Sequence, residues 1–186
     1  MGIYGHKGKY PHIDKSCFVA ESADIIGDVT IGAGSSVWYG AVIRGDMAPV
    51  TIGQNVSIQD NSMLHVDTGI PTVIGDNVTV GHGVIIHAAT VEDNCLIGMG
   101  AIVLDEVRIG HGSLVGAGAL VPPRKNIPPR SQVMGSPCAI TKQLTAEDEQ
   151  GFIDHAQRYL RLGGDYLVKK NSRKNNAKKF FQKPLQ

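Results

Sequence analysis

The chain has 186 residues, enough for one domain with a sizeable hydrophobic core and a short appendage. Its formal net charge is +1, which excludes an overall polyanion-binding surface and leaves nucleic-acid binding only a basic C-terminal tail in its favour. Aromatic residues make up 5% of the chain while glycine contributes 23 residues, which disfavours a compact two-layer domain and favours a fold built by repetition.

The N-terminal stretch and the cysteines bear on the compartment. MGIYGHKGKYPHIDKS has no apolar core of a signal peptide, and no apolar run of the chain is long enough to span a bilayer. The cysteines, Cys17, Cys95 and Cys138, are odd in number and have no CxxC spacing, so we expect no disulfide framework. These features predict a cytoplasmic protein with no membrane partner.

Val, Ile or Leu recurs every six residues along most of the chain, with three changes of phase. The repeat occupies eighteen positions: Ile13, Val19, Ile25, Ile31, Val37, Ile43, Ile52, Ile58, Leu64, Ile74, Val80, Ile86, Val91, Ile97, Val103, Ile109, Val115 and Val121. Glycine directly follows several of them, and we expect glycine to supply the positive φ angles of the corners; examples are Gly32, Gly53, Gly75, Gly98, Gly110 and Gly116. This hexapeptide repeat resembles the left-handed parallel β-helix, a triangular prism with three hexads per coil. The repeat therefore predicts about six coils.

The repeat is followed by a proline-rich stretch, VPPRKNIPPRSQVMGSPC, which we expect to end sheet pairing. The predicted β-helix domain, with its N-terminal lead-in and this terminator, therefore covers residues 1–140.

LTAEDEQGFIDHAQRYLRL indicates a helix within residues 141–168 that packs on the β-helix. Thr145 is the expected N-cap, with Asp148 in a capping box, and Gly163-Gly164 is the expected stop or break. An apolar stripe marks the packed face: Phe152, Ala156, Tyr159 and Leu160. Residues 169–186 carry seven Lys or Arg and no acid, and predict a solvated, partly disordered tail.

The repeat fixes the position of each polar residue on the prism, because the chain returns to the same corner three hexads later. Adjacent coils lie about 4.8 Å apart. Arg44, His65 and His87 each follow an anchor of one corner, so His65 and His87 are expected one above the other, with Arg44 one coil below. Asp60 and His82 each stand two residues after an anchor of a different corner, with Gln59 beside Asp60.

His82 and His87 therefore lie on different edges of the prism and should not meet within one chain. A cyclic trimer would bring His82 of one chain to His65 and His87 of the next, at three equivalent interfaces. Catalytic zinc is bound by three protein ligands, such as three imidazoles, and keeps a fourth position open. Fe²⁺ or Co²⁺ fits the same ligand set. The remaining histidines are expected to be ordinary surface residues: His6, His12, His111 and His155.

Three short motifs, IRGD (43–46), QDNSMLH (59–65) and GHGVIIH (81–87), together resemble the γ-class carbonic anhydrases. The resemblance covers nearly the whole chain and implies a homotrimer that hydrates CO2 to bicarbonate with a metal-bound hydroxide. It implies the metal ligands His65, His87 and, from the neighbouring subunit, His82. Around the metal it places Arg44, Asp46, Gln59 and Asp60, and it puts Tyr159 of the C-terminal helix near the site.

The sequence departs from this family at the position after RGD. The archaeal founding members carry a proton-shuttling Glu there and a second in an acidic loop, whereas this chain has Met47 and a short loop with only Asp67. Weak carbonic anhydrase activity is one reading of this departure. A non-catalytic metal-binding trimer is the alternative, and a hexapeptide acyltransferase is a further one. The ion pairs of Arg44, Asp46 and Asp60 could then be purely structural, and Tyr159 could be a packing residue.

Overall fold

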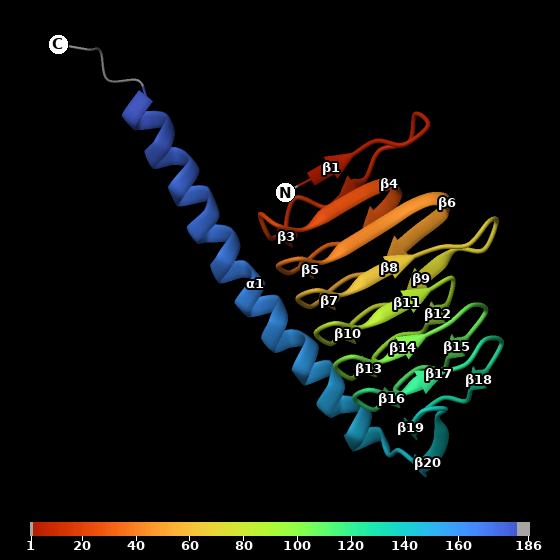
Figure 1. Cartoon of the computed structure of the whole chain (residues 1–186). Helices are drawn as coiled ribbons and strands as arrows, with labels where there is room; N and C mark the ends of the chain where they lie inside the picture. The colour runs from red at the N-terminus through yellow and green to blue at the C-terminus, as the bar shows by residue number, and fades with distance from the viewer. Residues whose placement is uncertain (1, 182–186) are drawn as a thin grey trace.

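A computed structural model describes the backbone of residues 2–181 and the side chains of residues 2–168. The chain forms a parallel β-solenoid of about seven turns with one C-terminal helix, consistent with a left-handed β-helix of hexapeptide repeats (Figure 1). Each turn contributes a short strand to each of three faces of the prism. Strands β4 (Asp24–Ile31) and β6 (Val42–Ile52) run around a corner and belong to two faces.

Every strand from β1 to β19 pairs in parallel with a strand one turn away, and this pairing defines the three faces. Face 1 holds the first halves of β4 and β6 together with β1 (Gly2–Tyr4), β8 (Met63–His65), β11 (Ile85–His87), β14 (Ile102–Val103) and β17 (Leu120–Val121). Face 2 holds the second halves of β4 and β6 together with β2 (His12–Ile13), β9 (Thr72–Ile74), β12 (Thr90–Val91), β15 (Arg108–Ile109) and β18 (Asn126–Ile127).

Face 3 holds strands from one end of the prism to the other. They are β3 (Phe18–Val19), β5 (Ser36–Val37), β7 (Ser57–Ile58), β10 (Thr79–Val80), β13 (Leu96–Ile97), β16 (Leu114–Val115) and β19 (Ser131–Met134). Strand β20 (Ala139–Gln143) pairs with β19 in antiparallel fashion and closes this end of the sheet.

The aliphatic repeat forms the core as expected. All eighteen anchors are buried except Ile13, which is half-buried at the N-terminal end. The solenoid has about seven turns, one more than the number expected, because Ile127 and Val133 are also fully buried anchors that extend the repeat. The prolines of the 121–138 segment do not end the pairing, since each strand needs only two paired residues and Pro122, Pro123, Pro128 and Pro129 fall between strands.

The glycines that follow the anchors serve a purpose other than the expected one. Gly98 has no positive φ, and a Cβ placed on it would lie 2.5 Å from the backbone nitrogen of Ala117 in the next coil. Glycine is therefore required here for close approach between coils. The positive φ angles belong to other turn residues, such as Gly83 at 67° and Asn94 at 60°.

Helix α1 (Ala146–Phe181) runs back along the prism and packs on face 3, against β3, β5, β7 and β10 (Figure 1). The predicted capping box is confirmed: the Asp148 backbone N–H donates to Thr145 Oγ1 at 3.1 Å, and the Thr145 N–H donates to Asp148 Oδ2 at 2.9 Å.

The glycine pair does not end or break the helix, contrary to expectation. Gly163 is buried, and a Cβ there would lie 3.2 Å from Ser36 Cβ and 3.6 Å from Phe18 Cβ. The pair thus lets the helix lie close to the prism. The backbone of residues 169–181, expected as part of a tail, continues the helix, while their side chains and residues 182–186 lie outside the described part of the chain.

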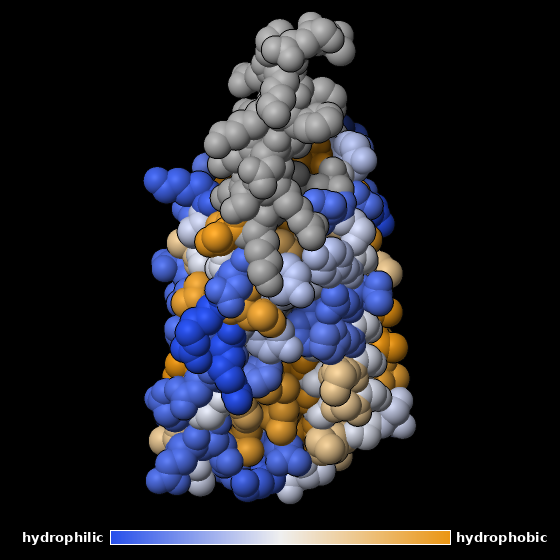
Figure 2. Space-filling view, turned by 90° about the vertical axis from the view of Figure 1, so that its left-hand side faces the viewer, coloured by the Kyte–Doolittle hydropathy of each residue, from blue (hydrophilic) through white to orange (hydrophobic). Residues whose placement is uncertain are grey.

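The outer surfaces of the three faces differ in polarity. Face 1 presents partly exposed apolar side chains: Val42, Met63, Ile85, Ile102 and Leu120. Face 2 presents mostly polar ones, including His12, Thr30, Thr51, Arg108 and Asn126. Face 3 is covered in part by α1, beside which hydrophobic side chains stay visible (Figure 2). Within the described residues, no helix has the length and apolar character needed to cross a membrane.

Candidate metal centre

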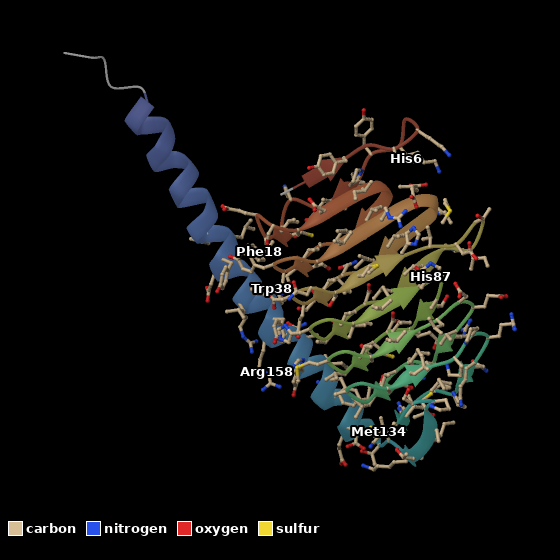
Figure 3. The ribbon with its side chains drawn as sticks, in the orientation of Figure 1. His6, Phe18, Trp38, His87, Met134 and Arg158 are labelled. Atoms are coloured by element: carbon tan, nitrogen blue, oxygen red, sulfur yellow. The ribbon has the colours of Figure 1, made fainter. Side chains whose placement is uncertain are left out.

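His65 and His87 stand in one column at the edge between faces 1 and 2, which we call the paired-histidine edge. Strand register places His87 directly beside His65, as the repeat predicts. The ring centroids are 5.1 Å apart, and His65 Nδ1 lies 3.2 Å from His87 Nε2. Figure 3 shows His87 on the side of the prism away from α1.

The second nitrogen of each of these imidazoles is held by a carboxylate. His65 Nε2 lies 3.0 Å from Asp46 Oδ1, and His87 Nδ1 lies 2.5 Å from Asp105 Oδ1. A carboxylate on one ring nitrogen fixes the tautomer and leaves a lone pair on the other nitrogen. Both free lone pairs therefore belong to the nitrogens that face each other.

The spacing of these two nitrogens fits a shared metal ion. Two nitrogens bound at 2.0–2.1 Å to a tetrahedral ion stand about 3.3–3.4 Å apart. The observed 3.2 Å separation is close to that value.

Arg44 also belongs to this edge and pairs with Asp46 of the same chain. Partial burial alone would raise the pKa of the Asp46 carboxyl, but hydrogen bonds with His65 and with Arg44 outweigh it and lower the pKa below its usual 3.8. Asp46 is therefore ionised at neutral pH and continues to orient His65.

His82 lies on the edge between faces 3 and 1, in the turn between β10 and β11, which we call the single-histidine edge. Its Nδ1 is 2.8 Å from Asp60 Oδ2, so the expected stacking of Asp60 and His82 is confirmed. The His82 side chain is 46% exposed, against 11% for His65 and 32% for His87. Within the described residues of one chain, no group of three His, Cys, Asp or Glu side chains is placed to hold a metal.

A groove of about 390 Å³ opens beside His82, between face 3 and α1. Gln59, which is nearly fully buried, lines it together with Tyr159 and His155 of the helix. Tyr159 packs edge-on against Trp38, with ring centroids 6.0 Å apart. Tyr159 is thus both a packing residue and a wall of the groove.

His155 was expected on the surface, and this expectation is wrong. It is half-buried, its Nδ1 lies 3.2 Å from Thr79 Oγ1, and its ring packs on Tyr159 at 5.2 Å between centroids. The reason is the direction in which α1 leaves the last coil, which turns this side of the helix toward the prism. His111 is partly exposed and lies 3.3 Å from Glu149.

Comparison with known proteins identifies the family. Two family models match, the bacterial transferase hexapeptide (six repeats) over residues 88–123 and the hexapeptide repeat of succinyl-transferase over residues 49–88. A carbonic anhydrase of Geobacillus kaustophilus is 46% identical over 177 residues, which cover 95% of this chain and 97% of that protein. The chain belongs to the γ-class carbonic anhydrase family.

Other γ-class relatives differ in length. A probable carbonic anhydrase of Methanocaldococcus jannaschii is 47% identical over 150 residues, covering 81% of this chain and 94% of that protein. Gamma carbonic anhydrase 2, mitochondrial, of Arabidopsis thaliana is 46% identical over 160 residues, covering 83% of this chain. The match spans only 58% of the plant protein's length.

Solved structures share the γ-class fold but carry other descriptions. A putative acetyltransferase of Bacillus cereus has a TM-score of 0.87 and 42% identity, covering 89% of this chain and 96% of that one. A hexapeptide transferase family protein of Anaplasma phagocytophilum has a TM-score of 0.85 and 36% identity, covering 89% and 98%.

Sequence reasoning missed Asp105 in this γ-class chain. Asp105 stands two residues after the anchor Val103, one coil beyond His87, so the repeat already placed an acid next to the histidine column. The prediction of the histidine column rests on the position directly after each anchor at this edge, whereas Asp105 reaches His87 from the next position.

Proposed function

We propose that the protein is a γ-type carbonic anhydrase that interconverts CO2 and bicarbonate at a metal ion held between two subunits of a homotrimer. His65 and His87 of one subunit and His82 of the next supply the ligands. Zn²⁺ suits three imidazoles, and Fe²⁺ or Co²⁺ fits the same set.

The observation that carries the proposal is the pair of facing imidazole nitrogens 3.2 Å apart, each ring held from behind by Asp46 or Asp105. Such a pair is half of a catalytic zinc site, and one chain offers no third ligand beside it among its described residues. The exposed His82, oriented by Asp60, supplies the missing ligand to a neighbour.

The apolar outer surface of face 1 supports the trimer. This face lies between the two histidine edges, since it connects the turn of His82 to the strand end of His87. Three chains that turn this face toward a common axis bury its apolar side chains, and each single-histidine edge then meets the neighbour's paired-histidine edge.

The surrounding residues bind and orient. Asp46, Asp60 and Asp105 hold the three imidazoles in one tautomer each, and Arg44 keeps Asp46 charged. Gln59 presents an amide in the groove beside His82, where it orients water and bicarbonate by hydrogen bonds. When bound, the metal lowers the pKa of a coordinated water toward neutrality, which supplies the nucleophile for CO2.

Localisation follows less directly. The three cysteines are free and buried, which agrees with a reducing compartment. The cytoplasmic location stays a prediction, because the plant relatives are named mitochondrial.

Stopped-flow CO2 hydration by the metal-loaded trimer tests the proposed activity. We expect turnover with Zn²⁺ or Fe²⁺ that disappears in His65→Ala and persists in His12→Ala, a change on the exposed polar face 2. Metal binding without turnover would favour the non-catalytic trimer, and coenzyme A binding without metal would favour the acyltransferase.

A further inference from the structure

We propose that His155 of α1 takes up the proton that CO2 hydration releases and passes it to bases in solution. This inference rests on the proposed function and adds a proton-transfer residue to it. His155 is not part of any of the three motifs that resemble the family. It follows all of them in the sequence, on the C-terminal helix.

The groove connects His155 with the proposed metal ligand. His155 and His82 both line it, together with Gln59, which directly follows β7, and Tyr159, one helical turn beyond His155. Its volume of about 390 Å³ has room for about a dozen water molecules. A chain of groove water can therefore carry a proton from the metal centre to the helix.

The two ring nitrogens of His155 have different surroundings. Nδ1 is bound to the Thr79 hydroxyl, and the ring is held against Tyr159. Nε2 has no hydrogen-bond partner among the described residues, which leaves it for exchange with groove water. A fixed ring with one free nitrogen is suited to proton transfer.

The charges around His155 keep its ring neutral at the start of a cycle. Burial, and to a lesser extent the nearby Arg158 cation, lower the pKa of His155 below its usual 6.5. Tyr159 packs on the same ring, and His82 with its Asp60 partner lies at the other wall of the groove. The neutral ring is the form that accepts a proton.

The step balances without any further reactant. Each CO2 and water give one bicarbonate and one proton, the proton joins the lone pair of His155 Nε2 to form an imidazolium, and a buffer base then removes it. The paired-histidine edge offers less for this task. Met47 exchanges no proton, and Asp46 and Asp105 are already bound to imidazoles.

The test compares wild type, His155→Gln and the control His12→Gln, each loaded with metal. We expect His155→Gln to keep its metal and its melting temperature. It should be near wild type in concentrated buffer and about tenfold or more slower in dilute buffer, with recovery on addition of imidazole. His12→Gln should match wild type throughout.

A second measurement needs no activity. Diethyl pyrocarbonate, which modifies neutral imidazoles, should label His155 in the metal-free protein at pH 7, as read by peptide mass spectrometry. An unreactive His155, or a His155→Gln enzyme equal to wild type in dilute buffer, overturns the inference. A loss of rate that imidazole does not rescue, or a loss of metal, also overturns it. If metal-loaded wild type shows no hydration at all, the proposed function itself has failed.

Discussion

The two histidine edges of the prism are built differently. At the paired-histidine edge, His65 and His87 are close-set, partly buried and each fixed by a carboxylate. At the single-histidine edge, His82 stands in an exposed turn beside a groove and has one carboxylate partner, Asp60. The first edge is pre-organised within one chain, whereas the second has no complementary ligands of its own. In the proposed trimer, each chain would therefore contribute to two different sites.

The largest expected effect comes from removing the proposed metal ligand at either histidine edge. His82→Ala and His87→Ala should each abolish metal binding, although the two residues lie on opposite edges of face 1. Metal analysis of the purified proteins measures this, with His12→Ala as the control that keeps full metal. A His82→Ala protein with full metal content would mean that the paired-histidine edge binds metal alone.

A smaller effect compares the carboxylates of the two edges. Asp105→Asn removes the acceptor behind His87, and Asp60→Asn removes the one behind His82. Each should weaken metal binding by about ten- to a hundredfold, because the imidazole loses its fixed tautomer and part of its basicity. Competition with a chromogenic chelator measures the affinity, and Asp67→Asn in the exposed loop is the control. Unchanged affinity in Asp105→Asn would remove this residue from the centre.

A substitution at Glu149 tests whether the attachment of the helix can be weakened without an effect on the metal-binding histidines. The buried Glu149 carboxylate lies 2.7 Å from Arg130 Nε and 2.9 Å from Asn94 Nδ2. Glu149→Gln should lower the free energy of unfolding by about 1–3 kcal/mol at pH 7 and leave metal content unchanged. Thermal denaturation and metal analysis of the same sample measure the two quantities. Loss of metal at unchanged stability would contradict the prediction.

The difference in stability between wild type and Glu149→Gln should change with pH in one direction. Burial alone would raise the pKa of Glu149, but hydrogen bonds from Arg130, Asn94 and His111 outweigh it and lower the pKa below 4.5. A carboxyl with a lowered native pKa stabilises the fold above pH 4.5 and loses that contribution as the pH falls through its native value. The stability difference between wild type and Glu149→Gln should therefore shrink below pH 4.5. A difference that grows on acidification would contradict this assignment.

The smallest effect separates two neighbouring glycines of the helix that packs on face 3. A Cβ at Gly164 meets nothing within 4 Å, whereas one at Gly163 meets Ser36 Cβ at 3.2 Å. Gly164→Ala should stabilise the helix by about 0.5–1 kcal/mol, and Gly163→Ala should gain less or lose stability. Equal gains in chemical denaturation would show that the helix does not pack closely on face 3.

The period of the sequence was sufficient to predict the relations between coils. His65 beside His87, and Asp60 beside His82, follow from the return of the chain to the same corner, because strand register is fixed by the buried anchors. The sequence does not predict the seventh turn, because prolines ordinarily end sheet pairing. Pro122 and Pro128 follow the end strands β17 and β18, beyond which no further coil accepts a backbone N–H, so the missing donors remove no ladder hydrogen bond.

The helix side of the site could not be predicted in the same way. The hexad repeat says nothing about the direction of α1, so the groove shared by His82 and His155 appears only in three dimensions. The glycine pair was misread for a related reason. A helix stop and a close helix contact both favour glycine, and only the position of Gly163 over Ser36 distinguishes them.

Subunit mixing tests the shared site most directly. His82→Ala chains keep the paired-histidine edge and His87→Ala chains keep the single-histidine edge, so each trimer alone has no complete site. A trimer with both variants has one interface where intact halves meet, and random one-to-one assembly should restore about a quarter of the wild-type metal content. No metal in the mixed trimers, or full metal in either variant alone, would contradict a site built from two chains.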